Sequence, residues 1–392
     1  MTVLAVIFGL ALLLAVLVSS LADRGPLSTT VVFLGVGLVA GPVALDLVDT
    51  TPEAVETAAE IALFAILFID GQHAPASVIH GCWRTAGRAL VVATPLTFAL
   101  VAVSAHYLVG LPWLAAAVLG ALLAPTDPVF ASALVGRDEV PAEVRRTLNV
   151  ESGLNDGLAL PAVLLLAGLA GGRPEGWTTD PLMLLLEVVL GVALGVAVPA
   201  AVVLLLKVPG VGAVERLRPL GPLAVAVILW GVCDLVSANQ FLAAFCAGST
   251  VATLRPSSSE AFRPTGELVS ELVKGAALLA FATLLDPTLF VTAGVVGVMF
   301  ALLVVPVSRP LAMWPATAGA GLPVAQRMGL SWFGPKGFAS VAYAVIVLLS
   351  GMEHAEEVFA LATVSVLVSV VAHSTLDVPL SARLQRAEAR QG

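Results

Sequence analysis

Two short polar stretches stand out in a chain whose residues are mostly apolar. Thr126 and Asp127 lie between two prolines in the first stretch, and Ser152 and Asp156 lie in the second. Ser152 and Asp156 are four residues apart, so in a helix their hydroxyl and carboxylate share one face. With backbone carbonyl groups freed at the prolines, such as that of Thr126, these oxygens suit a hard cation. No His or Cys is close to either stretch in sequence, so a transition-metal site is not indicated.

The carboxylates of these stretches can also bind protons, because burial beside a second carboxylate favours the neutral form. A group that holds either a cation or a proton, but never both, is the central part of an ion exchanger. The residues alone leave a second interpretation open, in which Asp156 is the structural partner of a buried base. Against it, the acids Asp127, Glu151 and Asp156 outnumber the one or two bases expected at the same depth.

The overall composition indicates that these polar side chains are carried by membrane-spanning helices. Of 392 residues, 59% are hydrophobic and 12% are charged, and the mean hydropathy is +1.01. A soluble chain carries about twice that charged fraction, and a domain of this size cannot bury so much apolar surface. The same numbers exclude a disordered protein, and no Lys/Arg-rich run indicates nucleic-acid binding. We therefore expect an all-α polytopic membrane protein.

Thirteen apolar segments are long enough, at about 20 residues, to cross a bilayer as helices. With the N-terminus outside, the cytoplasmic loops and tail contain 16 of the 19 Lys and Arg residues; Lys274 and Lys336 fall inside segments, and Arg173 alone lies outside. This asymmetry predicts an external N-terminus and a cytoplasmic C-terminus at the plasma membrane, with the first segment a spanning helix rather than a signal peptide. The segments lie near residues 2–21, 28–48, 53–72, 87–109, 112–136, 143–171, 181–207, 219–236, 238–254, 266–286, 288–308, 326–350 and 355–375.

Segments 5 and 12 are interrupted by proline and glycine, at residues 124–128 and 333–337 respectively. Proline removes a helix hydrogen bond, and an irregular backbone is tolerated at membrane depth only where protein or a wet cavity surrounds it. Seven segments separate the two breaks, so the broken helices run in opposite directions, as in an inverted repeat. A single kink is common in membrane helices, but a matched pair of breaks, each with a charged residue, indicates a transporter with two broken helices crossing near the midplane.

The positive groups inside or beside the segments have partners that the sequence alone does not fix. Lys336 lies at the break in segment 12, and Arg309 ends segment 11, where composition alone favours a side chain that snorkels to the cytoplasmic surface. Lys274 lies in segment 10, three residues after Glu271 and seven after Glu267. These three share one helix face, so we expect an intrahelical ion pair there.

The remaining polar residues carry weaker expectations. We expect Asp70, Asp234 and Asp286 to be solvated or to line an entrance funnel, and Glu187 either to make a satisfied polar contact or to lie at a subunit interface. A pH-sensing role stays open for the histidines, which lie mostly near segment ends. The three cysteines have no metal-like spacing, so neither a disulfide nor a zinc site is expected.

The motif Pro125-Thr126-Asp127-Pro128, followed by Glu151-Ser152-x-x-Asn155-Asp156, resembles monovalent cation:proton antiporter family 1, which includes the NhaP-type and animal sodium/proton exchangers. The resemblance covers nearly the whole chain. It implies that Asp156 is the carboxylate that binds the ion and the proton, and that Thr126, Asp127 and Ser152 join it around the cation. It also implies that Asn155 supports the crossing of segments 5 and 12, and that Glu151 pairs with Arg309 in a structural ion pair.

One position departs from the family pattern. The family usually has Gly-x-Arg-Gly in segment 12, whereas this chain has Lys336 in Gly-Pro-Lys-Gly. Lysine is a compact charge that can lose its proton when buried, whereas arginine keeps its charge and a five-donor fork. The role of position 336 is therefore open.

The resemblance implies exchange of Na⁺, or of Li⁺ or K⁺, for H⁺ by a homodimer, without a cofactor or enzymatic activity. Because the adjacent residues 155 and 156 are Asn and Asp, and not two Asp, only one carboxylate is available there. We therefore expect electroneutral 1:1 exchange. Inverted repeats are expected at about 1–171 and 219–375, a linker helix at 181–207, mobile core helices at about 87–171 and 288–375, and a short cytoplasmic tail at 376–392 without a large regulatory domain. A passive cation channel and an intramembrane aspartyl protease using Asp127 and Asp156 are the alternatives.

Overall fold

The computed structural model describes residues 2–22, 29–48, 50–127, 140–172, 178–208 and 214–388, and within these ranges every regular element is a helix. The expected all-α fold is confirmed. The second half of predicted segment 5 lies outside the described residues. The helices of the first half are α1 (Thr2–Ala22), α2 (Thr29–Ala40), α3 (Pro52–His73), α4 (Ala76–Arg88), η1 (Ala89–Ala93), α5 (Thr94–Ser104), η2 (Ala105–Val109), α6 (Trp113–Leu123) and α8 (Ala142–Leu169).

The helices that follow overlap predicted segments 7 to 13, and the last of them continues past the predicted end at residue 375 to Glu388. They are α9 (Pro181–Leu205), η3 (Glu215–Leu217), α10 (Leu220–Leu235), α11 (Gln240–Leu254), α12 (Pro256–Ala282), α13 (Pro287–Ala316), α14 (Val324–Trp332), α15 (Phe338–Leu349) and α16 (Ala355–Glu388). Among the described helices, six are long and apolar enough to cross a membrane by length and composition, and shorter apolar helices accompany them.

Several predicted boundaries are wrong, and most of the errors have one cause. Segment 4 was expected to begin near residue 87, but α4 and two π-helical turns make residues 76–109 one continuous helix. Cys82, Thr85 and Ala86 are buried while Arg84 and Arg88 are exposed, so α4 is amphipathic. A hydropathy window detects apolar runs and misses amphipathic turns. For the same reason α12 begins about ten residues early. Helix α13 continues to Ala316, because the buried Arg309, where the prediction ended segment 11, does not end the helix.

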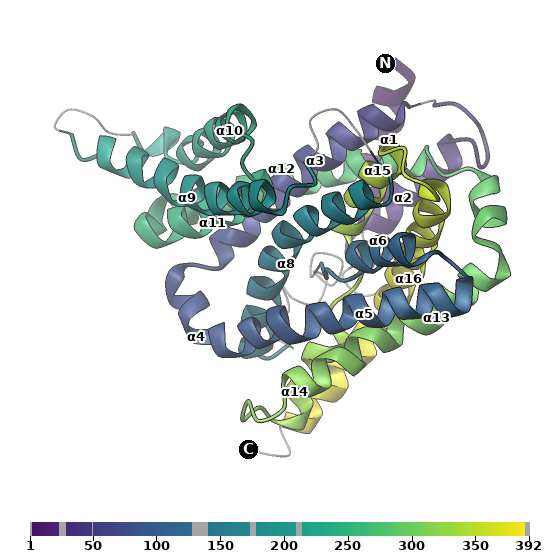
Figure 1. Cartoon of the computed structure of the whole chain (residues 1–392). Helices are drawn as coiled ribbons and strands as arrows, with labels where there is room; N and C mark the ends of the chain where they lie inside the picture. Colours follow the sequence, from purple (N-terminus) through teal and green to yellow (C-terminus); the bar gives the residue numbers. More distant parts are fainter. Residues whose placement is uncertain are drawn as a thin grey trace.

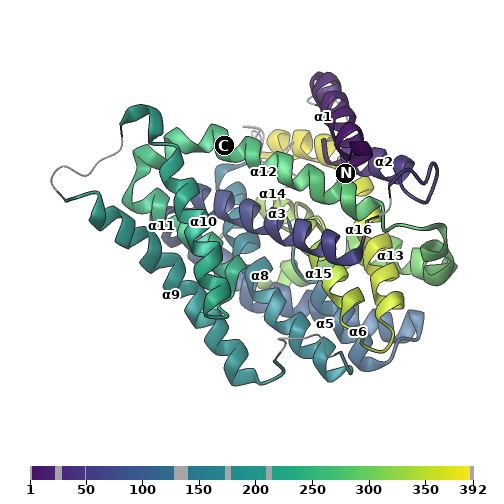
Figure 2. The same cartoon turned by 90° about the horizontal axis from the view of Figure 1, so that it is seen from above.

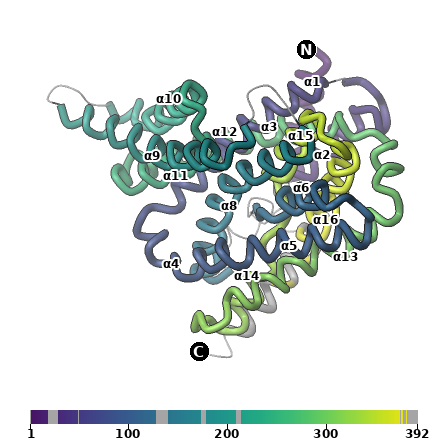
Figure 3. The backbone as a smooth tube through the Cα atoms, viewed as in Figure 1, coloured from purple at the N-terminus to yellow at the C-terminus, as the bar shows by residue number. Residues whose placement is uncertain are grey.

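The helices form two groups with α8 between them. Figure 1 shows α9, α10 and α11 together at one side and α5, α13 and α16 at the other, and Figure 2 shows the same separation from above. The backbone trace in Figure 3 follows α8 through the middle of the molecule. The principal packing pairs are α3 with α11 and α12, α9 with α11, and α13 with α16.

Helices α3 and α11 approach each other through reciprocal glycines. A Cβ atom on Gly71 would lie 2.1 Å from the carbonyl oxygen of Phe245, and one on Gly248 would lie 2.0 Å from that of Phe68. Small residues of this kind let membrane helices pack backbone against backbone, where van der Waals contact rather than water exclusion drives association. The position of α3 relative to the rest of the molecule therefore depends on these two residues.

We expect Gly248→Ala to destabilise the protein by about 1–3 kcal/mol, because a methyl group there overpacks a close helix contact. Thermal unfolding in detergent, followed by size-exclusion chromatography, measures the change. Gly231→Ala is the matched control, since Gly231 lies inside α10 and a Cβ atom there would meet nothing within 4 Å. Equal melting temperatures for the two variants would contradict the proposed packing.

Candidate functional site

The two interrupted segments meet backbone to backbone. Helix α6 ends at Leu123, and the chain then runs without helical structure to Asp127. Helices α14 and α15 are likewise separated by the non-helical residues 333–337. The amide nitrogen of Asp127 donates to the carbonyl oxygen of Pro335 at 3.0 Å, so the two irregular peptides lie in contact.

Each peptide supplies a charge to the end of the other's helix. An oxygen of the Asp127 carboxylate accepts a hydrogen bond from the amide of Phe338, the first residue of α15, at 2.7 Å. The Lys336 ammonium lies 3.5 Å from the carbonyl oxygen of Pro125, beyond the C-terminal end of α6, and Ser340 Oγ donates to the carbonyl of Leu122 at 2.7 Å. A carboxylate at a helix N-terminus and a cation at a C-terminus both complement the helix dipole.

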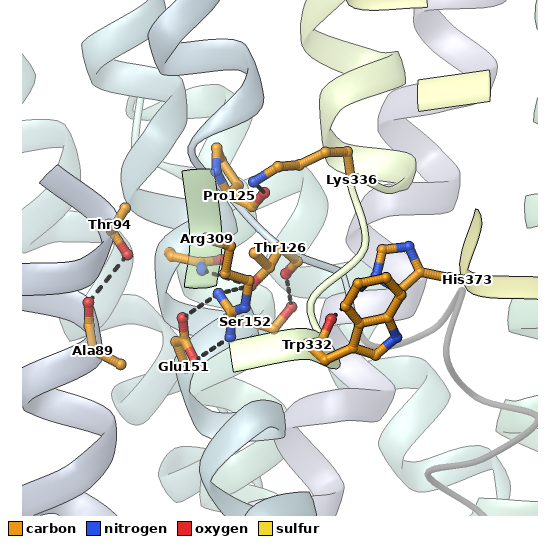
Figure 4. A network of polar contacts seen from close by, with 11 residues as sticks. Ala89, Thr94, Pro125, Thr126, Glu151, Ser152, Arg309, Trp332, Lys336 and His373 are labelled. Atoms are coloured by element: carbon orange, nitrogen blue, oxygen red, sulfur yellow. Dashed lines mark hydrogen bonds and ion pairs between the residues drawn. The ribbon is translucent and has the colours of Figure 1, made fainter. Parts of the chain in front are cut away.

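This arrangement assigns a position to Lys336, whose role the sequence left open. The side chain is buried and crosses to the break of segment 5, as Figure 4 shows. The lysine ammonium is a compact positive charge, and this is enough to complement the partial negative charge of the carbonyl groups at the C-terminal end of α6. Gly337 is required beside it, because a Cβ atom at that position would lie 2.0 Å from the Cβ of Asp127.

Arg309 and Glu151 form a buried bidentate ion pair. Arg309 Nη1 donates to Glu151 Oε1 at 2.8 Å, and Nη2 donates to Oε2 at 3.0 Å. The two residues are 4% and 1% exposed, so the snorkelling interpretation of Arg309 is wrong. Arg309 Nη1 also reaches Thr126 Oγ1 at 3.3 Å, and a Cβ atom on Gly334 would lie 2.1 Å from Arg309 Nε. The pair thereby connects α8 and α13 to both breaks.

Thr126 is the meeting point of the α8 side chains. Ser152 Oγ donates to the carbonyl oxygen of Thr126, and Asn155 Nδ2 donates to Thr126 Oγ1 at 3.2 Å. Because the Ser152 hydrogen is used in this bond, the lone pairs of its oxygen remain for a ligand. Gly153 and Gly157 let the opposite face of α8 pack directly on α11, where side chains would collide with Phe245 and Leu242.

Asp156 is buried beside this network, with 3% exposure, and among the described residues its Oδ1 atom has no hydrogen-bond partner. Its backbone carbonyl accepts from the hydroxyl of Tyr343 at 2.6 Å. Its carboxylate interacts electrostatically with those of Asp127, Asp70 and Glu151 and with the Lys336 ammonium. A buried carboxylate oxygen without a donor is a ligand position for a cation or a proton.

Asp70, which the sequence predicts to be solvated or to line an entrance funnel, lies close enough to the breaks to interact with their charges. It is half-buried near the C-terminal end of α3, where its carboxylate interacts with those of Asp127 and Asp156 and with Lys274. Its backbone carbonyl accepts from Asn149 Nδ2 of α8 at 3.0 Å. Nothing in the local sequence shows that the end of α3 faces the break in segment 5. Among the described residues, no group of three or more His, Cys, Asp or Glu side chains is arranged to hold a metal ion together.

The other polar residues make contacts mostly among themselves or with the backbone. Lys274 pairs with Glu271, as expected, and Thr29 also donates to Glu271, whereas Glu267 pairs with His73 at 3.3 Å instead. Asp234 is exposed, Asp286 accepts from the amide of Thr288 at the start of α13, and Glu187 is half-buried. The three cysteines Cys82, Cys233 and Cys246 are free. His373, near the predicted end of segment 13, is buried and hydrogen-bonded beside the break in segment 12.

Two interrupted helices that cross beside buried carboxylates define the class of secondary transporters built on broken helices. Residues 9–382 match the family model described as the transmembrane sodium/hydrogen exchanger, and the chain belongs to this family.

Individual relatives agree with this assignment. The chain is 24% identical over 370 residues to the K(+)/H(+) antiporter NhaP of Alkalimonas amylolytica, covering 93% of this chain and 64% of that protein. It is 25% identical over 387 residues to the K(+)/H(+) antiporter NhaP2 of Shewanella oneidensis, covering 95% and 65%. It thus spans about two-thirds of the length of these curated relatives. The solved sodium proton antiporter MjNhaP1 of Methanocaldococcus jannaschii has the same fold, with a TM-score of 0.78, 18% identity and coverage of 96% of this chain and 97% of that one.

The ion pair between Glu151 and Arg309 predicts strong energetic coupling. We expect Glu151→Leu or Arg309→Met alone to cost about 3–5 kcal/mol, because each leaves an uncompensated buried charge, and the double variant to cost less than either. Thermal unfolding of the three variants measures the coupling. Glu267→Gln, which removes a half-exposed partner of His73, is the control and should cost at most about 1 kcal/mol. Additive losses would show that the pair does not act as a unit.

Proposed function

We propose that this protein exchanges a monovalent cation for a proton across the membrane by competition of the two ions at Asp156. The observation that carries the proposal is the buried carboxylate oxygen of Asp156, which has no donor among the described residues and lies beside the crossing of two broken helices. A proton and a cation both complete such an oxygen, and each excludes the other. The names of the relatives, which are cation/proton antiporters, support the same conclusion.

The cation is held by oxygen atoms from α8 and the first break. Deprotonated Asp156 supplies the charge, and the hydroxyl oxygen of Ser152 and the backbone oxygen of Thr126 supply neutral ligands. Asp127 adds a second negative charge at the start of α15. Asn155, Glu151, Arg309 and Lys336 hold the crossing in place. Protonation of Asp156 removes the charge that attracts the cation, so the cation leaves when the proton binds.

Exchange requires that this site face the two sides in turn. We assign the moving core to about residues 87–171 and 288–375 and the scaffold to the remaining helices, with inverted repeats at about 1–171 and 219–375, a linker helix at 181–207 and a cytoplasmic tail from residue 376. In a homodimer the scaffold contains the subunit interface; the largely exposed apolar surface of α9 supports this assignment. The orientation proposed is an external N-terminus in the plasma membrane.

The names of the relatives leave the cation open, since they include both potassium and sodium antiporters. We propose Na⁺ first, with Li⁺ and K⁺ as the alternatives, and electroneutral 1:1 exchange because one carboxylate carries the competition. The aspartyl protease alternative is weakened because one oxygen of Asp127 is used by the amide of Phe338. A passive channel is the remaining alternative, and it differs in giving cation flux without proton counterflow.

We expect Asp156→Asn to abolish exchange, because an amide holds neither the proton nor the cation charge. Proteoliposomes with an internal pH dye and an imposed pH gradient receive Na⁺, Li⁺ or K⁺ in turn, and a valinomycin/K⁺ clamp in the Na⁺ and Li⁺ runs tests electroneutrality. Asp234→Asn, at an exposed position on α10, is the control and should match the wild type. Full activity of Asp156→Asn would place the site elsewhere. No response of the wild type to any cation would reject exchange altogether.

We expect Asp70→Asn, assayed at pH 9 where the wild-type carboxyl is ionised, to keep exchange but to raise the cation concentration for half-maximal activity about three- to tenfold. The substitution then removes one negative charge near the site at an effective dielectric of about 20. The same proteoliposomes measure this value at fixed pH. Glu187→Gln, a half-buried acid of α9, is the matched control. An unchanged half-maximal concentration in Asp70→Asn would remove Asp70 from the electrostatics of the site.

A further inference from the structure

The irregular peptide between α14 and α15 is tied to α16 at both of its ends. At one end, the amide nitrogen of Lys336 donates to Ser369 Oγ at 2.8 Å. At the other end, His373 Nε2 lies 3.1 Å from the carbonyl oxygen of Trp332, the last residue of α14. Ser369 and His373 are one helical turn apart, so they lie on the same face of α16.

The two α16 side chains are also connected to each other. His373 Nδ1 lies 2.8 Å from the backbone oxygen of Ser369 and 3.4 Å from its hydroxyl oxygen. The imidazole also packs against the indole of Trp332, with ring centroids 5.2 Å apart, and Figure 4 shows the two rings side by side next to the peptide that carries Lys336. Ser369 and His373 are 0% and 5% exposed, so water does not replace these contacts.

These contacts replace helix hydrogen bonds that the break removes. A backbone amide or carbonyl left without a partner at membrane depth costs several kcal/mol, so an irregular peptide takes up the geometry that its side-chain partners impose. Ser369 is such a partner for the Lys336 amide, and His373 adds a second contact to the carbonyl oxygen of Trp332, which also accepts from the amide of Gly334 at 2.8 Å. Both side chains belong to a continuous helix that is packed against α13 and α15. The position of the peptide is therefore set by α16.

We propose that His373 and Ser369 are positioning residues of the exchange site, which hold the second break by its two ends and so fix Lys336 and the start of α15 against the first break. The proposal deepens the proposed function and rests on it. Lys336 reaches Pro125, and Phe338 donates to Asp127, so a shift of this peptide changes the charges and donors around Asp156. Neither His373 nor Ser369 touches the cation in this proposal.

If His373 and Ser369 act by positioning, removing their hydrogen bonds should weaken cation binding. Replacing His373 by glutamine, whose amide has a similar reach, should restore it. We expect His373→Leu and Ser369→Ala to raise the half-maximal cation concentration about tenfold, as expected when buried hydrogen-bonding groups lose their partners. The proposal takes the imidazole proton to be on Nε2, which donates to Trp332. We expect His373→Gln to stay within about twofold of the wild type, because the glutamine amide can donate to Trp332 from the same place.

His106→Leu is the matched control. His106 also lies against a carbonyl oxygen, that of Leu111 at 2.7 Å, and stacks on the Trp113 ring at 4.0 Å, but it lies at the end of residues 76–109, away from the crossing. We expect this variant to keep the wild-type half-maximal concentration. Equal shifts in His106→Leu and His373→Leu, or equal shifts in His373→Gln and His373→Leu, would overturn the proposal.

Hydrogen–deuterium exchange tests the same contacts without any transport assay. Loss of the Ser369 hydroxyl should speed exchange of the Lys336 amide, and we expect the peptide covering residues 333–338 to exchange about tenfold faster in Ser369→Ala than in wild type or in His106→Leu. An unchanged rate of deuterium uptake in this peptide would refute the proposed positioning by Ser369, even if ion transport were altered. A wild type that exchanges no cation but shows this protection would refute the proposed function and leave the contacts established.

Discussion

Backbone hydrogen bonding in an apolar surrounding is the constraint on which the rest of this structure depends. An unbroken helix satisfies its own amides and carbonyls, but a helix broken at membrane depth leaves several of them open. This protein contains two such breaks and places them against each other. The contact from Asp127 to Pro335, the cap of Phe338 by Asp127 and the approach of Lys336 to Pro125 all answer that need.

The candidate ion site results from this contact between the two breaks. Satisfying the breaks brings α8, α13 and α15 together around Thr126, with a bidentate pair between Glu151 and Arg309 on one side. The charges of Asp127, Lys336, Glu151 and Arg309 are each used by a partner. Among the carboxylates at the crossing, both oxygens of Glu151 bind Arg309, whereas one oxygen of Asp156 has no hydrogen-bond partner among the described residues. The surroundings that satisfy the breaks thus leave one carboxylate oxygen without a donor, and this is where we propose that the exchanged ions bind.

Local sequence predicted what depends on local properties. The thirteen segments follow from hydropathy, the breaks follow from proline and glycine, and the shared face of Ser152 and Asp156 follows from helical periodicity. Amphipathic α4 and the extension of α13 were missed because apolar runs mark only part of a helix. The proximity of Asp70 to Asp156, and the contacts of His373, depend on packing between helices far apart in sequence. Arg309 is a further example. Its local composition favours a surface position, and only the resemblance to a family indicates its buried partner Glu151.

The reciprocal charges at the crossing also have a consequence for biosynthesis. The carboxylate that caps α15 comes from the first half of the chain, and the ammonium at the end of α6 comes from the second half. Each half supplies some partners of its own break, Ser152 for Thr126 and Ser369 for Lys336, but the bonds that join the two breaks need both halves. The contacts of Asp127 with Pro335 and Phe338 therefore form only after residues 333–338 have been made. Assembly of the crossing is thus a late step in the folding of the chain.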